Sequence, residues 1–260
     1  MSAIGPLLNE SYNQPHRHRA PSSVMHSLPQ DLTESLTALE RDIDTGLYRA
    51  GRWQALVRSL RRLPQPQRAG LSEAISRVSD KLHAPKARWR VAFSLGLAVE
   101  LGLALVGAGL LWLAIRTRAS WAGVMAALIL TVAFQPLIKI LTGTVLGIRY
   151  AYAYLLGPEP RFKMRFGTYI AAPRSARIIF HLSGAVGSPL GAWLPTQILG
   201  SQLSAATKFC WVLFGIVVAI NAVPFVLALS GLQRIGGVRL SLGSAASAAL
   251  EIREALQDGR

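Results

Sequence analysis

Four polar side chains interrupt the most apolar parts of this 260-residue sequence, and they are the first candidates for chemistry. Glu100 is the only charge in one apolar stretch; Gln135 and Lys139 lie in the next, and Asn221 in the last. Gln135 and Lys139 are four residues apart and therefore share one face of a helix. Such side chains either join helices by hydrogen bonds or form a site for a ligand, an ion or a peptide.

The elements that must position these side chains are four apolar stretches. Each is long enough for a helix to cross ~30 Å of hydrocarbon, which takes ~20 residues. They cover residues 91–115, 121–148, 178–199 and 209–232. Only 16% of the residues are charged, whereas a soluble domain has about 25%. The sequence therefore predicts an all-α integral membrane protein with four transmembrane helices. A single cysteine, Cys210, excludes an intramolecular disulfide.

Glu100 and Lys139 are expected at the same depth, because each lies nine residues from the end of its stretch, at Val91 and Ile148. At 1.5 Å per residue, both lie roughly 13 Å inside the membrane. This match predicts a buried Glu100–Lys139 ion pair. Gln135 and Asn221 fall in a similar layer, so the sequence predicts one polar cluster of Glu100, Gln135, Lys139 and Asn221.

The distribution of Lys and Arg predicts the orientation. The chain has 28 Lys and Arg against 13 Asp and Glu, a net charge of +15. Basic residues gather before the first stretch, between the second and third, and after the fourth. The other two loops contain only Arg116, Arg118 and Lys208. The positive-inside rule then places both termini and the middle loop in the cytoplasm, at the plasma membrane. Anionic lipid head groups are the expected partners. Nucleic acid is not expected, because the basic residues flank the stretches and line no single groove.

A short cytoplasmic β-hairpin is predicted between the second and third stretches. Residues 149–155 alternate, which is typical of a strand and puts Tyr150, Tyr152 and Tyr154 on one face. Gly-Pro-Glu-Pro at 157–160 is typical of a turn, and basic and apolar residues alternate over 161–166. The basic residues expected to contact lipid or a partner protein are Arg149, Arg161, Lys163 and Arg165.

The two ends of the chain are expected to lie outside the membrane. Residues 1–30 have four prolines and no apolar period, which indicates a disordered tail. Residues 31–85 have leucines at helical spacing and predict a helical hairpin or three-helix unit, which either packs on itself or docks another protein. The membrane domain covers residues 86–240. Residues 241–260 form a cytoplasmic tail with a short helix.

The segment Gln135-Pro-Leu-Ile-Lys139 resembles the first core helix of the site-2 protease family of intramembrane zinc metallopeptidases. That family has H-E-x-x-H in mid-helix, then small residues and a glycine-containing turn into a β-hairpin. Asn221-Ala-Val-Pro224 followed by Leu229-Ser-Gly231 resembles the family's N-x-x-P and L-D-G segment, with one extra residue. The resemblance covers roughly residues 134–235.

The resemblance does not extend to the catalytic groups. A catalytic zinc needs three His, Cys or carboxylate ligands, and the motif's glutamate is the general base. At the positions of the two histidines and the glutamate, this sequence has Gln135, Lys139 and Pro136. The aspartate position falls on Leu229 or Ser230. His181 is the only histidine at membrane level, and we interpret it as an interfacial side chain. No catalytic residue, metal or cofactor is therefore expected.

The sequence thus predicts a non-catalytic site-2-protease-like membrane protein that binds or regulates another integral membrane protein. Three alternatives remain open. One is an active intramembrane metallopeptidase with unusual ligands. The second is an accessory subunit of a membrane complex. The third is a small transporter whose proline-broken helices meet at mid-membrane.

Overall fold

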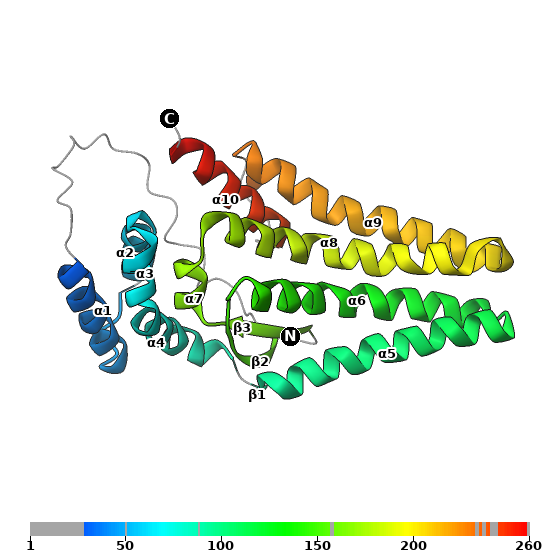
Figure 1. Ribbon diagram of the computed structural model, residues 1–260, viewed down its shortest axis with the longest axis horizontal. Helices are drawn as coiled ribbons and strands as arrows, with labels where there is room; N and C mark the ends of the chain where they lie inside the picture. The colour runs from blue at the N-terminus through cyan, green and yellow to red at the C-terminus, as the bar shows by residue number, and fades with distance from the viewer. Residues whose placement is uncertain are drawn as a thin grey trace. The chain divides into compact units, whose positions relative to one another are not determined.

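The computed structural model describes residues 29–49, 51–87, 89–156, 159–231, 234–235, 238–239 and 244–258. Most of them are helical. The chain divides into two compact units, Met1–Lys86 with Phe166–Ala171, and Ala87–Arg165 with Ala172–Arg260. Figure 1 labels helices α1–α10 and strands β1–β3. The expected disordered tail, up to residue 28, lies outside the described residues.

The first unit is a small bundle of helices around leucine, isoleucine and valine side chains. Its described helices are α1 (Pro29–Asp44), α2 (Arg52–Arg62), α3 (Gln65–Gly70), α4 (Ser72–His83) and α7 (Phe166–Ala171), with a 3-10 turn, η1 (Ala84–Lys86). Gly46 and Gly51 have positive φ angles of 72° and 94°, which let the chain leave α1 and enter α2. Pro64 then separates α2 from α3. The predicted two- or three-helix region therefore contains four helices among its described residues.

Helix α7 joins this unit although it follows the β-hairpin in the sequence. The backbone N–H of Gly167 donates to Ser76 Oγ at 3.1 Å. A Cβ on Gly167 would collide with the carbonyl group of Ser72, so glycine allows α7 to lie directly on α4. The rings of Phe166 and Trp53 are 5.6 Å apart. This helix was not predicted from the sequence.

Among its described residues, the second unit has four long helices and a short fifth one. They are α5 (Phe93–Thr117), α6 (Ser120–Val145), α8 (Arg174–Leu199), α9 (Ser204–Leu229) and α10 (Ser244–Asp258), with a 3-10 turn, η2 (Gly200–Leu203), before α9. Among the described residues, α5, α6 and α9 are long and apolar enough to cross a membrane. This agrees with a membrane-embedded, multi-pass protein. Helix α8, over the third predicted span, is not among these three.

The long helices pack in chain order, with α6 between α5 and α8, and α8 between α6 and α9 (Figure 1). Small residues allow the close approach of α8 to α6, as is usual between membrane helices. A Cβ on Gly187 would lie 2.6 Å from Gln135 Cα, and one on Gly191 would meet the Leu130 carbonyl. In the first half of α6, one apolar cluster contains residues from all four long helices. It contains Leu111, Ala114, Ala122, Ala126, Ala127, Leu130, Leu199, Leu203, Ala206 and Cys210.

A three-stranded antiparallel sheet lies at the end of this unit where α5 begins. Its strands are β1 (Arg90–Ala92), β2 (Tyr150–Leu156) and β3 (Glu159–Met164), in the order β1-β2-β3. The predicted hairpin is present as β2 and β3. Strand β1 was not predicted: Val91 pairs with Ala153, so the first helix begins at Phe93 and not at Val91. A separate two-residue pair, β4 (Arg234–Ile235) and β5 (Val238–Arg239), precedes α10.

Candidate functional site

Gln135 lies where α6 packs on α8. Ser188 Oγ of α8 donates to Gln135 Oε1 at 3.3 Å. The residue before this serine is Gly187, which lies so close to the Gln135 backbone that a side chain at this position would collide with it. The amide therefore lies in a close interhelical contact and bonds to the neighbouring helix.

Lys139, one turn further along α6, also contacts α8. Its Nζ is 4.9 Å from the centroid of the Phe180 ring, which is the range of a cation–π interaction. The hydroxyl of Tyr150, at the start of β2, donates to the Lys139 carbonyl oxygen at 3.0 Å. Gln135 and Lys139 therefore both contribute to the contact between α6 and α8.

Glu100 does not pair with Lys139, so the predicted ion pair is wrong. The Glu100 side chain is fully buried, and neither of its carboxylate oxygens has a hydrogen-bond partner among the described residues. The reason is rotation about the helix axis. Lys139 lies on the side of α6 that faces α8, whereas α5 packs on the other side of α6 (Figure 1). Equal depth does not bring two side chains together when they leave their helices in different directions.

Asn221 bonds within its own helix and not with the other three polar residues. Its Nδ2 donates to the Val217 carbonyl at 2.9 Å. Close contact between α6 and α9 occurs elsewhere, at the far end of α6, where a Cβ on Gly123 would lie 3.2 Å from Ala206 Cβ. The structure therefore places Gln135 and Lys139 together against α8, and does not join Glu100 or Asn221 to them by a hydrogen bond.

The described residues hold a buried ion pair that the sequence analysis missed. Arg177, in the first turn of α8, pairs with Glu251 of α10: Nε and Oε2 are 3.2 Å apart, and the two side chains are 1% and 3% exposed. Arg177 directly precedes the third predicted stretch and belongs to the basic residues that gather between the second and third stretches. The partners are 74 residues apart in the chain, and no local pattern marks either one. Helix α10 also packs on α9, where Ala246 and Ala249 form an apolar cluster with Ala228.

The basic hairpin residues divide into two groups. Arg161 and Lys163 lie within β3, opposite Tyr154 and Tyr152 of β2. Arg149 and Arg165 lie outside the strands, where the Arg165 N–H donates to the Arg149 carbonyl at 2.8 Å.

Tyr150 does not share a face with Tyr152 and Tyr154, contrary to the prediction. The strand register shifts between Tyr150 and Tyr152, and this irregularity reverses the alternation. Tyr150 stacks on Phe93 of α5 at 5.3 Å, and burial raises the pKa of its hydroxyl group. It therefore anchors the sheet to α5 and α6.

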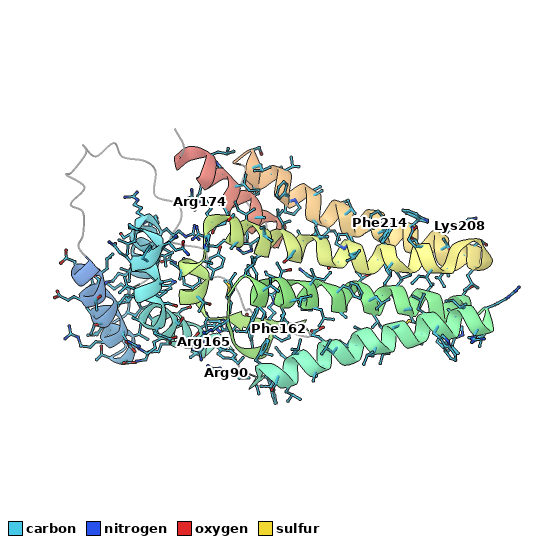
Figure 2. All side chains as sticks on the ribbon, viewed as in Figure 1. Arg90, Phe162, Arg165, Arg174, Lys208 and Phe214 are labelled. Atoms are coloured by element: carbon cyan, nitrogen blue, oxygen red, sulfur yellow. The ribbon has the colours of Figure 1, made fainter. Side chains whose placement is uncertain are left out.

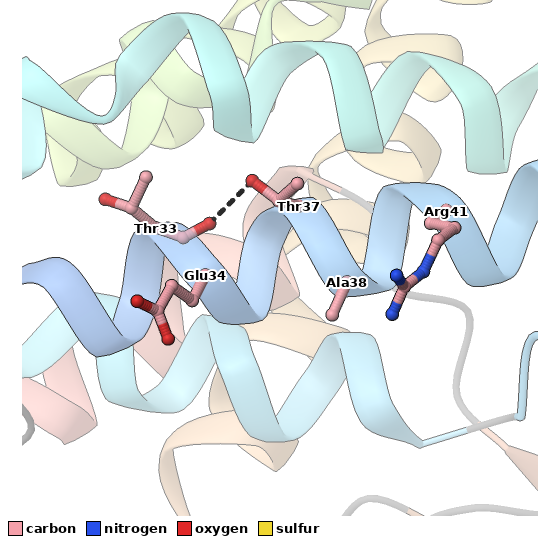
Figure 3. A pocket seen from close by; sticks show the side chains of 5 residues that line it. All are labelled: Thr33, Glu34, Thr37, Ala38 and Arg41. Carbon is pink, nitrogen blue, oxygen red and sulfur yellow. Dashed lines mark hydrogen bonds between the residues drawn. The ribbon is translucent and has the colours of Figure 1, made fainter.

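A shallow hollow of about 370 Å³ lies on α1, lined by Thr33, Glu34, Thr37, Ala38 and Arg41 (Figure 3). All of its lining residues come from this one helix. The Thr37 hydroxyl already donates to the Thr33 carbonyl at 2.9 Å. We assign no chemistry to this hollow.

Among the residues that the structure describes, no three His, Cys, Asp or Glu side chains gather closely enough to hold a metal ion. Comparison with protein-family models, curated proteins and solved structures finds no match for this chain. The likeness to site-2 proteases therefore depends on the two sequence motifs and the hairpin between them.

Proposed function

We propose that this chain is a non-catalytic relative of the site-2 proteases that binds another integral membrane protein and regulates or stabilises it. The observation that carries the proposal is the contact around Gln135. Where the resembled enzymes would hold a metal and a water molecule, Ser188 bonds to the amide and Gly187 packs on its backbone. Packed side chains with neutral or cationic polar groups suit a scaffold better than a hydrolytic centre.

The proposal includes four membrane spans, with both termini in the cytoplasm and the plasma membrane as location. Helix α8 has 26 residues, or ~39 Å at 1.5 Å each. It follows α6 from Gly187 to Leu199, which lies beside Gly123 near the start of α6. Its low hydropathy fits its position, because α6 and α9 cover it on two sides. A helix covered by other helices needs less apolar surface than one that faces lipid.

The outward face of α9 is the surface that we propose for the partner. Val212, Ile216, Ile220 and Val223 recur at helical spacing, and each is more than half exposed. β-Branched side chains have few rotamers in a helix, so they lose little entropy when another helix packs on them. A transmembrane segment of a partner protein would bury this ridge.

A metal measurement on the purified full-length protein tests the non-catalytic part. We expect well under one zinc per chain in the wild type and in Gln135→Ala alike. Stoichiometric zinc that disappears in Gln135→Ala would overturn the proposal in favour of a peptidase with unusual ligands.

Site-specific photocrosslinking in native membranes tests the partner. A photoreactive amino acid at Ile220 of α9 should give one discrete protein adduct, and the same probe at Leu105 of α5 should not. Both side chains are exposed, at 65% and 73%, so Leu105 is a matched control. Lipid adducts alone at Ile220 would contradict the proposal. Several adducts that co-purify with the chain at fixed stoichiometry would indicate an accessory subunit of a membrane complex. Solute flux through the protein in proteoliposomes would indicate a transporter.

A further inference from the structure

The three-stranded sheet has one apolar face, which is covered by α5. Val91 lies opposite Ala153, and Ala153 lies opposite Phe162, so these three residues share a face. A Cβ on Gly96 of α5 would collide with Ala153 Cβ and lie 3.0 Å from Phe162. Phe162 also meets Phe93 edge to face, at 6.0 Å. This face of the sheet is therefore packed against the start of the helix.

The opposite face carries positive charges and tyrosines. Arg90, Tyr154 and Arg161 form one cross-strand row, and Tyr152 and Lys163 lie in the next row with Ala92. We call Arg90, Tyr152, Tyr154, Arg161 and Lys163 the basic sheet face. The Arg90 guanidinium lies 5.2 Å from the Tyr152 ring centroid, and its Nε donates to the Ala87 carbonyl at 3.1 Å. Three positively charged side chains and two tyrosine rings therefore share this face of the sheet.

The position of the sheet along α5 places these charges at the level of lipid head groups. Strand β1 ends at Ala92 and the apolar helix begins at the next residue, Phe93. Arg90 is three residues from that point, at most about 10 Å even in a fully extended chain. The head-group layer is roughly 5–8 Å thick on each side of the hydrocarbon. Figure 2 shows Arg90, Phe162 and Arg165 together at this end of α5.

We propose that the basic sheet face binds the head groups of anionic phospholipids. The guanidinium fork and the ammonium group donate to phosphate oxygens, and tyrosine hydroxyls suit the interface between apolar and aqueous layers. Anionic lipid is favoured over a protein because the strands adjoin the ends of α5 and α6, where lipid is always present. The inference requires that α5 lie in a membrane, and it is independent of any partner protein.

The test measures phospholipids retained by the full-length protein. Protein in mixed micelles of phosphatidylglycerol and phosphatidylcholine is analysed by native mass spectrometry. Arg161→Ala with Lys163→Ala should lower phosphatidylglycerol retention about fivefold per residue, with phosphatidylcholine unchanged. Arg116→Ala with Arg118→Ala is the matched control. It removes two exposed positive charges at the other end of α5 and should lower retention by a smaller factor than the sheet variant does, because it leaves the basic sheet face intact.

Three further results decide the proposal. Equal loss in both double variants would overturn it, because net charge alone would then explain the binding. Arg161→Lys with Lys163→Arg preserves charge and should keep the preference even if the alanine variant folds poorly; loss of the preference in this folded variant would also overturn it. Displacement of the lipid by 10 mM inorganic phosphate would indicate a free-anion site instead. Failure of the Ile220 crosslink would leave this measurement unaffected.

Discussion

Two buried carboxylates in the second unit have opposite surroundings. Glu251 of α10 pairs with Arg177 of α8, with Nε and Oε2 3.2 Å apart and both side chains buried. Glu100 of α5 is equally buried, but its oxygens have no hydrogen-bond partner among the described residues. A paired charge fixes how two helices fit together, whereas an unpaired polar group in an apolar environment only costs free energy. The contact of α10 is therefore specified by charge, and that of α5 by shape.

The close contacts that α5 makes with its neighbours depend on glycines. Gly96 admits Ala153 and Phe162 of the sheet, and a Cβ on Gly107 would lie 2.8 Å from Leu130 of α6. Glu100 lies one turn after Gly96 on the same helix face. Glu100 therefore lies between two positions at which α5 approaches its neighbours closely.

The largest effect is expected at the paired carboxylate. Glu251→Met leaves Arg177 buried without its partner and should lower the free energy of unfolding by about 3–5 kcal/mol. Adding Arg177→Met should recover most of that loss, because no unpaired charge remains. Chemical unfolding in detergent micelles measures both, with Arg118→Met, an exposed arginine, as a control near zero. Simple additivity of the two single effects would show that the pair is not coupled.

The same substitution at the other carboxylate should have the opposite sign. Glu100→Met replaces two unpartnered oxygens by an apolar side chain of similar length and should raise the free energy of unfolding by about 2–3 kcal/mol. The measurement is the same unfolding assay. A loss of stability as large as that of Glu251→Met would mean that Glu100 makes a favourable interaction, and the contrast between the two sites would fail.

The contact of α5 with the sheet can be tested by adding a methyl group on the helix and then removing one from the sheet. Gly96→Ala should destabilise by about 1–2 kcal/mol, because the new Cβ meets Ala153. Ala153→Gly in the same chain should restore part of the lost stability, because Phe162 still lies 3.0 Å from the new Cβ. Gly102→Ala is the control on the same helix: it has open space around it and should gain about 0.5–1 kcal/mol from helix propensity. A stabilising Gly96→Ala would contradict a contact specified by shape.

The smallest expected effect concerns the hydrogen bond from Tyr150 to the Lys139 carbonyl. Tyr150→Phe should cost about 1 kcal/mol at pH 7. Burial raises the pKa of this hydroxyl in the folded protein, so its contribution is complete below the unfolded-state pKa of about 10 and declines above it. Unfolding measured from pH 8 to 11 should therefore show a steeper loss for the wild type than for Tyr150→Phe. Parallel curves would show that Tyr150 is not buried in solution.

The sequence by itself determined the features that depend on neighbouring residues along the chain. Mean hydropathy over about 20 residues located α5, α6 and α9, and the alternation around Tyr152 and Lys163 located the hairpin. Hydropathy does not single out α8 in the same way, and its Gly187 and Gly191 lie in close contact with the backbone of α6. The bulge at Tyr150 is also invisible in the alternation that it interrupts.

Only the tertiary structure decided which side chains meet. Depth in the membrane follows from counting residues, but the direction in which a side chain leaves its helix relative to its neighbours follows from packing. Glu100 and Lys139 match in depth and differ in direction, so they do not pair. Arg177 and Glu251, 74 residues apart, pair because α10 folds back onto α8. Position along a helix is a local property of the chain, and partnership across helices is a property of the whole fold.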